Sequence, residues 1–167
     1  ETLSLLEDGM NIAEVGVGSG AISLSLLKAT DKVISIVGVD ICEKALDVAE
    51  INAFRFERLF KQGQKFSLIK SDRLSLVEGP FDAIISNPPY IKKRADCDSV
   101  HAKVLEFEPS VALFIDDDEY DLWFTNFFKD VYNKLTDNGF FLMEGHERHL
   151  SDQANLLKVC DFKDVKI

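Results

Sequence analysis

Four consecutive residues, Asn87-Pro88-Pro89-Tyr90, bring together an amide, two prolines and an aromatic ring directly after the apolar run 81–86. Each proline lacks an N–H group and restrains the residue before it to an extended conformation. We therefore predict a stiff turn, called the proline turn below, with free carbonyl groups and an amide side chain. Such a turn can hold a planar amino or amide group through its N–H bonds. For four residues taken alone, a proline-rich loop without chemistry is the alternative.

A glycine-rich segment, Gly16-Val17-Gly18-Ser19-Gly20, follows the apolar run 11–15 and is called the glycine loop below. Glycines let the backbone approach a ligand closely, and a helix that starts after such a loop offers unpaired N–H groups. Glu14 stands two residues before the first glycine. There its carboxylate can accept hydrogen bonds from a cationic ligand that carries an amino acid. The alternative is that Glu14 only braces the loop.

Two further acidic sites follow later strands. Asp40 comes after the apolar run 33–39, where an acid can accept hydrogen bonds from both hydroxyls of a ribose. Ser71-Asp72 follows the run 66–69 and is placed to meet an adenine amino group. The predicted ligand is therefore a cofactor that contains adenosine.

Two adenosine cofactors fit this pattern. Gly16-x-Gly18-x-x-Ala21, with Asp40 downstream, satisfies a loose dinucleotide fingerprint, so a nicotinamide-dependent dehydrogenase is one hypothesis. Glu14 favours the other cofactor, S-adenosylmethionine, which carries an ammonium and a sulfonium group and has no pyrophosphate to repel.

Alternating apolar patterns predict the elements that must position these residues. Strands are expected at 11–15, 33–39, 66–69, 83–86, 140–144 and 162–167, and helices at 21–29, 43–60, 101–105, 120–135 and 150–160. This alternation predicts an α/β fold with a mostly parallel sheet and helices on both faces. In such sheets, ligands bind beyond the carboxyl ends of the strands. We expect a single domain over residues 1–167.

Composition and charge narrow the classes of partner. The chain has 167 residues with 46% hydrophobic content, enough for a substantial core. A formal net charge of −10 repels phosphate backbones and disfavours direct nucleic-acid binding. Lys92-Lys93-Arg94, directly after the proline turn, is either a solvated loop or a local guide for substrate. The sequence shows no apolar run long enough to cross a membrane and no signature of an oligomeric state.

Three further groups of residues are expected to have structural rather than functional roles. The three cysteines form no C-x-x-C pair, which predicts reduced thiols, a cytoplasmic location and no metal site. His146 and His149 could share a helix face, but a third metal ligand is not evident, so we expect a solvated helix start. An aromatic stripe at helical spacing is expected to pack on the sheet rather than receive a partner. Its members are Phe124, Phe127, Phe128 and Val131.

Taken together, these segments resemble the amino-directed class I methyltransferases, and more closely the HemK/PrmC family of protein-glutamine N5-methyltransferases. The resemblance covers nearly the whole chain and rests on the order and spacing of individually weak motifs. They are the glycine loop with residues 21–26, Val39-Asp40 with residues 45–53, Ser71-Asp72, residues 81–91 and residues 107–113. The last of these is similar to a stretch that separates this family from DNA amino-methylases.

This resemblance implies a Rossmann-like class I fold, S-adenosylmethionine as cofactor and S-adenosylhomocysteine as product. It implies methylation of a glutamine side-chain amide in a protein, in the Gly-Gly-Gln motif of a class I peptide-chain release factor. The residues implied to bind the cofactor are Glu14, Gly16, Val17, Gly18, Ser19, Gly20, Asp40, Ile41, Asp72, Arg73 and Asn87. Those implied to bind the amide are Asn87, Pro88, Pro89 and Tyr90, of which Asn87, Pro88 and Tyr90 are implied to be catalytic.

Several features depart from the family pattern. Glu14 stands where Asp is usual, and Arg73 stands where an aromatic residue commonly flanks the adenine. The acidic run 116–121 replaces a glycine-containing loop, and we expect it to be a solvated turn. The N-terminal helical domain and the closing strand of the family are missing, so we expect a fragment of a longer enzyme. The alternative functions are an adenine-N6 or other nucleic-acid amino-methyltransferase and a non-catalytic cofactor-binding domain.

Overall fold

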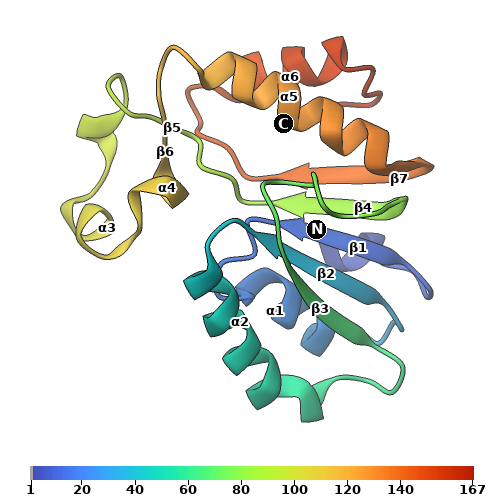
Figure 1. Ribbon diagram of the computed structural model, residues 1–167. Helices are drawn as coiled ribbons and strands as arrows, with labels where there is room; N and C mark the ends of the chain where they lie inside the picture. Colours follow the sequence, from blue (N-terminus) through green and yellow to red (C-terminus); the bar gives the residue numbers. More distant parts are fainter. Residues whose placement is uncertain (1) are drawn as a thin grey trace. The chain divides into compact units, whose positions relative to one another are not determined.

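The computed structural model (Figure 1) describes residues 2–167, which divide into two compact units. Unit 1 comprises the chain up to Ser86 together with Lys134–Met143. Unit 2 comprises Asn87–Asn133 and Glu144–Ile167. None of the helices within residues 2–167 is both long enough and apolar enough to span a membrane. The single domain expected from the sequence stays a prediction.

Unit 1 is built on a five-stranded sheet whose neighbouring strands are all parallel, in the order β3-β2-β1-β4-β7. Its strands are β1 (Asn11–Val15), β2 (Ser35–Asp40), β3 (Lys65–Lys70), β4 (Phe81–Ser86) and β7 (Leu135–Met143). Its helices are α1 (Ala21–Ala29) and α2 (Glu43–Phe56), with 3₁₀ turns at Thr2–Leu5 and Glu57–Leu59. The predicted parallel sheet is confirmed.

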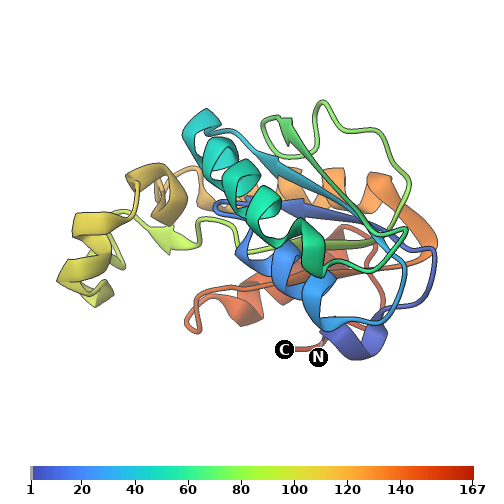
Figure 2. The ribbon, with the colours of Figure 1, turned by 90° about the horizontal axis from the view of Figure 1, so that it is seen from below.

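The central strands of unit 1 form its core because their side chains are apolar. Ile12 and Ala13 of β1, and Ala83 and Ile84 of β4, are at most 1% exposed. Near-continuous apolar runs of this kind are typical of buried parallel strands. Leu27 of α1 joins Ile12 in one core cluster. The helices α1 and α2 lie on the same side of the sheet, in front of the strands in Figure 2.

The two strands that precede the predicted binding segments are paired in the sheet of unit 1. Val15, the last residue of β1, pairs with Ser86, the last residue of β4. The Ser86 hydroxyl donates to the Val15 carbonyl at 2.8 Å. The glycine loop starts directly after Val15, and the proline turn starts directly after Ser86. The strand order changes direction between β1 and β4, and α/β sheets bind ligands at such a switch point.

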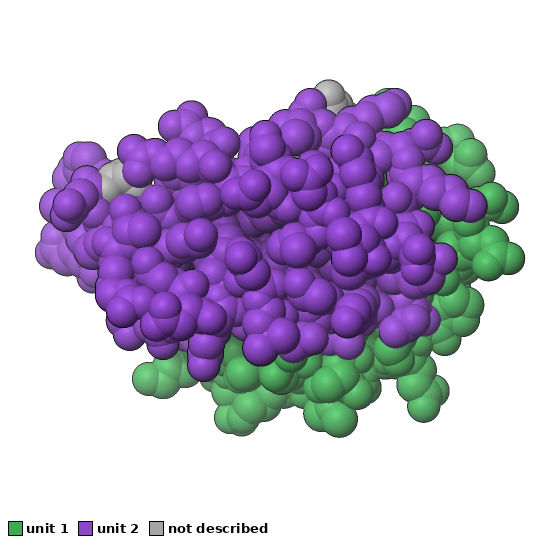
Figure 3. Space-filling model, turned by 90° about the horizontal axis from the view of Figure 1, so that it is seen from above, with its two compact units in different colours: residues 1–86, 134–143 green, residues 87–133, 144–167 purple. Residues whose placement is uncertain are grey.

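Unit 2, purple in Figure 3, contains mainly helices. They are α3 (Ala102–Phe107), α4 (Ser110–Leu113), α5 (Tyr120–Lys134, of which Lys134 belongs to unit 1) and α6 (Leu150–Val159), with a 3₁₀ turn at Cys97–Ser99. The strands β5 (Ile91–Lys92) and β6 (Phe114–Ile115) form a separate parallel pair, which was not predicted because two residues carry no periodic pattern. All four residues of the aromatic stripe in α5 are 0% exposed, which excludes an exposed partner groove at this stripe.

Three predicted elements require correction. Residues 162–167 do not form the last strand, since Asp161 and Asp164 adopt φ angles of 67° and 54°, which interrupt an extended chain. The strand predicted at 140–144 instead covers Leu135–Met143. Phe81 of β4 pairs with Leu135, but Ala83 pairs with Phe140, so the extra residues of β7 between these two pairs form an irregular, bulged stretch that the sequence pattern did not indicate. The helix predicted to run to residue 60 ends at Phe56 and continues as a 3₁₀ turn.

Candidate functional site

The glycine loop is held at the end of β2 by its own backbone. The N–H groups of Gly16 and Val17 both donate to the carbonyl of Val39, at 2.8 and 2.9 Å. Gly18 adopts a φ of 53°, and a Cβ atom added there would meet nothing within 4 Å. The loop therefore has a conformation that favours glycine and leaves space over its backbone. This is the geometry expected of a segment that lets a ligand approach the main chain.

Asp40 joins the glycine loop to the start of α2. Its Oδ2 accepts the N–H of Gly18 at 2.9 Å, and its Oδ1 accepts the N–H of Cys42 at 2.9 Å. The structure thus brings together two predicted site residues, Gly18 and Asp40, that are 22 residues apart in the sequence. Ile41 is 53% exposed and leaves an apolar surface beside the carboxylate. Contacts of Asp40 and Ile41 with a cofactor stay predictions.

The segment after β3 lies next to Asp40. The Ser71 N–H donates to the Asp40 carbonyl at 3.0 Å, and the buried Ser71 hydroxyl accepts the N–H of Leu76 at 3.0 Å. These bonds close a turn that presents Asp72 at the surface. The Asp72 carboxylate pairs with the Arg73 guanidinium at 3.3 Å. Both residues therefore lie at the carboxyl end of β3, where a contact with adenine is predicted.

Glu14 lies in β1, two residues before the glycine loop, and is 2% exposed. Its Oε2 accepts the N–H of Ser23 at 2.9 Å and also the Ser23 hydroxyl. Ser23 lies in the first turn of α1, whose N–H groups have no partner within the helix. Burial raises the pKa of Glu14 to about 7, because the hydrogen bonds from Ser23 offset the loss of water only in part. This geometry supports the bracing alternative, and the contact with a cofactor stays a prediction.

Replacing Glu14 by Gln should remove a pH dependence of stability. The folded-state pKa of about 7 exceeds the ordinary value of 4.5, so the folded protein binds this proton more tightly than the unfolded chain. The free energy of unfolding should therefore fall by roughly 3 kcal/mol as the pH rises from below 4.5 to above 7. Glu14→Gln keeps an acceptor for Ser23 and should show a flatter profile in urea denaturation at a series of pH values. Parallel profiles for the two proteins would contradict this expectation.

In unit 2, the proline turn presents an exposed Asn87 and a half-buried Tyr90. The Tyr90 hydroxyl donates to Oε1 of Glu144 at 2.8 Å. Burial, together with this hydrogen bond, raises the pKa of Tyr90 to about 12, so the hydroxyl stays protonated. Glu144 was not among the predicted site residues. A signal was present, because Glu144 is an acid at the end of a strand, as Asp40 is.

The basic cluster after the proline turn is engaged within unit 2. Lys93 pairs with Asp116 at 3.2 Å, and the Arg94 guanidinium pairs with Asp118 at 2.8 Å. Asp117 accepts the N–H of Arg94 at 2.8 Å. This part of the acidic run is an exposed turn, as predicted, and it also forms ion pairs with the cations beside it. Less positive charge is left to guide a substrate.

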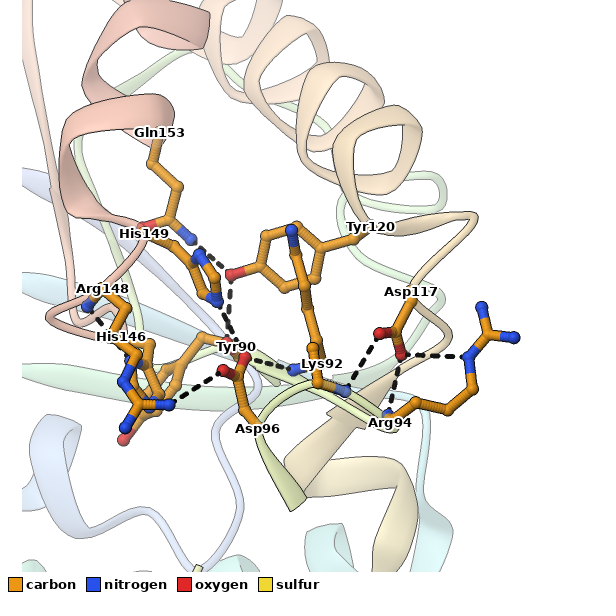
Figure 4. Close-up of polar contacts among 11 residues, drawn as sticks. Tyr90, Lys92, Arg94, Asp96, Asp117, Tyr120, His146, Arg148, His149 and Gln153 are labelled. Carbon is orange, nitrogen blue, oxygen red and sulfur yellow. Dashed lines mark hydrogen bonds and ion pairs between the residues drawn. The ribbon is translucent and has the colours of Figure 1, made fainter. Parts of the chain in front are cut away.

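A polar cluster surrounds Tyr90 in unit 2 (Figure 4). The Nε2 atom of His149 lies 2.7 Å from Oδ2 of Asp96, which is 3% exposed. Arg148 Nη1 lies 3.6 Å from the other Asp96 oxygen. Burial acts to raise the pKa of Asp96, but the hydrogen bonds from His149 and the Lys92 N–H outweigh it and hold that pKa below its ordinary value. The predicted solvated helix start is therefore wrong for His149.

Comparisons with known proteins bear on the family. The family model described as methyltransferase small domain matches residues 2–110. The chain is 30% identical over 158 residues to the release factor glutamine methyltransferase of Flavobacterium psychrophilum, covering 95% of this chain and 53% of that protein. It is 36% identical over 139 residues to the protein of the same name from Streptococcus pneumoniae, covering 83% and 47%. The chain spans about half the length of these curated relatives.

Solved structures show the same fold. A ribosomal protein L11 methylase from Lactobacillus delbrueckii subsp. bulgaricus aligns with a TM-score of 0.63 and 20% identity, over 98% of this chain and 66% of that chain. A methyltransferase from Pyrococcus furiosus aligns with a TM-score of 0.62 and 17% identity, over 98% and 71%. These matches confirm the predicted Rossmann-like class I fold. The chain belongs to the methyltransferase small domain family, and within it to the HemK/PrmC group of methyltransferases.

Proposed function

We propose that this protein transfers a methyl group from S-adenosylmethionine to the side-chain amide nitrogen of a glutamine in a protein. The proposed target is the Gly-Gly-Gln motif of a class I peptide-chain release factor. The proposal rests on one observation: Val15 and Ser86 are paired in the sheet, and the glycine loop and the proline turn follow them directly in the sequence. The names of the curated relatives support the same reaction. The glycine loop serves the methyl donor, and the proline turn serves the amide.

The residues of unit 1 fit S-adenosylmethionine. The open space at Gly18 admits the methionine part of the ligand, and the Asp40 carboxylate accepts hydrogen bonds from the ribose hydroxyls. Asp72 and Arg73, at the end of the neighbouring strand, flank the adenine. When bound, this cofactor supplies a methyl group activated by a sulfonium centre.

The proline turn positions the acceptor. An amide nitrogen is a poor nucleophile because its lone pair is delocalised into the carbonyl. The side-chain oxygen of Asn87 and the carbonyl of Pro88 accept its two N–H bonds, and the ring of Tyr90 packs on the amide plane. Holding the nitrogen in line at roughly 3–3.5 Å from the methyl carbon then supplies much of the rate. The same two oxygens stabilise the positive charge that develops on the nitrogen during transfer.

The partner in this proposal is a protein, and unit 2 has room for its chain beside Tyr90. A pocket of about 340 Å³ is lined there by Tyr90, Gly145, His146, Glu147 and Arg148. We propose that it receives residues that flank the target glutamine. Cys42, Cys97 and Cys160 are free thiols, which supports a reducing, cytoplasmic location.

Labelled S-adenosylmethionine tests the proposal directly. The full-length protein should place one labelled methyl group on the glutamine of the Gly-Gly-Gln motif, as located by peptide mass spectrometry. A release factor with Glu in place of that Gln lacks the amide nitrogen and should stay unlabelled. Failure of the full-length protein to transfer the label, although it binds S-adenosylhomocysteine, would refute the proposal.

The curated relatives and the acidic balance of the chain favour a protein acceptor over a nucleic acid. Tight binding of duplex DNA at physiological salt, followed by adenine methylation, would instead support the nucleic-acid alternative. Binding of NAD without binding of S-adenosylhomocysteine would support a dehydrogenase.

A further inference from the structure

Tyr90 is held at two separate points in unit 2. Its hydroxyl donates to Glu144 at 2.8 Å. Its main-chain carbonyl accepts the hydroxyl of Tyr120 at 3.0 Å (Figure 4). Tyr120 is the first residue of α5 and lies 30 residues from Tyr90 in the sequence. The second bond is therefore a tertiary contact onto the last residue of the proline turn.

The direction of the Tyr120 O–H bond is defined because Gln153 already donates a hydrogen bond to the Tyr120 oxygen. Nε2 of Gln153 donates to the Tyr120 oxygen at 3.1 Å, which leaves the Tyr120 proton for the Tyr90 carbonyl. Tyr120 and Gln153 are each 2% exposed, so water competes little for these bonds. Burial, with the nearby Asp96 carboxylate, raises the pKa of Tyr120, which keeps its hydroxyl a donor.

The ring of Tyr120 is contacted from two other elements of unit 2. The ring of His149, the residue before α6, has its centroid 5.3 Å from the Tyr120 centroid, and His149 is tied to the buried Asp96. The Nζ atom of Lys92, on β5, lies 4.7 Å from the Tyr120 ring centroid. These contacts hold the ring in place, so the hydroxyl meets the Tyr90 carbonyl from a fixed position.

We propose that Tyr120 is a positioning residue for methyl transfer, which orients the end of the proline turn by donating to the Tyr90 carbonyl. This inference rests on the proposed function. The two prolines restrain their own φ angles and the residues before them, Asn87 and Pro88. The peptide plane after Tyr90 is restrained by neither proline. The Tyr120 hydroxyl supplies that restraint, and small errors in the position of a reacting group are costly in rate.

Tyr120→Phe in the full-length protein removes the hydroxyl and keeps the ring. We expect kcat for methyl transfer to fall by at least about tenfold, while KM for the release factor and Kd for S-adenosylhomocysteine change by less than about twofold. Tyr132→Phe is the matched control, because Tyr132 lies on the same helix and is 46% exposed. The control should leave all three constants unchanged.

The Tyr90 carbonyl itself can be observed by NMR spectroscopy. Tyr90-Ile91 is the single Tyr-Ile pair in these 167 residues, so ¹³C-carbonyl tyrosine with ¹⁵N-isoleucine labels this one peptide bond, and loss of the signal in Ile91→Val assigns it. Loss of a hydrogen bond moves a carbonyl carbon resonance upfield. We expect this upfield shift in Tyr120→Phe and an unmoved resonance in Tyr132→Phe.

Two results would overturn the inference: an unmoved Tyr90 carbonyl resonance in Tyr120→Phe, or a moved resonance with kcat unchanged. A wild-type protein that transfers no methyl group would refute the proposed function instead, while the resonance would still report the contact. If Tyr120→Phe fails to fold, Gln153→Met decides, since it keeps the Tyr120 hydroxyl but removes the group that orients it. It should lower kcat relative to the wild type, and an unchanged kcat would overturn the inference.

Discussion

Asn87→Ala is expected to lower the rate of methyl transfer by at least about a hundredfold, because it removes one of the two oxygens proposed to hold the amide nitrogen in line. Asn87 is exposed, so the folded structure should tolerate the change. The free energy of unfolding should shift by no more than about 0.5 kcal/mol. Single-turnover transfer of a labelled methyl group, measured beside urea denaturation, separates the loss of rate from a loss of folding.

Two companion variants sharpen this result. Asn87→Asp keeps an acceptor oxygen at the same position and should retain more activity than Asn87→Ala. Asn138→Ala removes an exposed amide from β7 and should leave the rate unchanged. Activity that survives Asn87→Ala at the wild-type rate would favour a domain that binds the cofactor without using the proline turn.

Asp40→Ala should weaken S-adenosylhomocysteine binding by at least about a hundredfold and destabilise the fold by about 3–6 kcal/mol. The carboxylate accepts the N–H groups of both Gly18 and Cys42. Each hydrogen bond to a charged group contributes about 1.5–3 kcal/mol. The substitution therefore removes the proposed ribose acceptor and also releases the glycine loop from the start of α2. Calorimetric titration and urea denaturation measure the two effects separately.

An exposed acid on α2, the helix that follows Asp40, provides the control. Asp47 is exposed, and Asp47→Ala removes the same charge from the helix that Asp40 precedes. It should leave binding unchanged and alter stability by no more than about 0.5 kcal/mol. If Asp40→Ala lowered stability but bound S-adenosylhomocysteine as tightly as the wild type, the ribose role would be wrong and Asp40 would act only on the loop.

Much of unit 1 could be predicted from the sequence, because local patterns specify it. The strand at 11–15 and the helix at 21–29 have the predicted bounds. A tight turn between a buried strand and a helix needs residues at positive φ, which glycine adopts without strain, and Gly18 has such an angle. The loop and Asp40 were both expected at the carboxyl ends of parallel strands, which lie at one edge of a sheet, whereas the hydrogen bond between them became visible only in the structure.

The surroundings of the proline turn, by contrast, depend on tertiary structure. The sequence alone indicated a stiff turn with an amide and an aromatic ring. The partners of Tyr90 became visible only in the fold, because Glu144 and Tyr120 stand 54 and 30 residues away from it in the sequence. The pairing of Asp96 with His149, across 53 residues, is of the same kind. Periodicity and turn propensity describe neighbours along the chain, whereas these hydrogen bonds form only between segments that folding brings together.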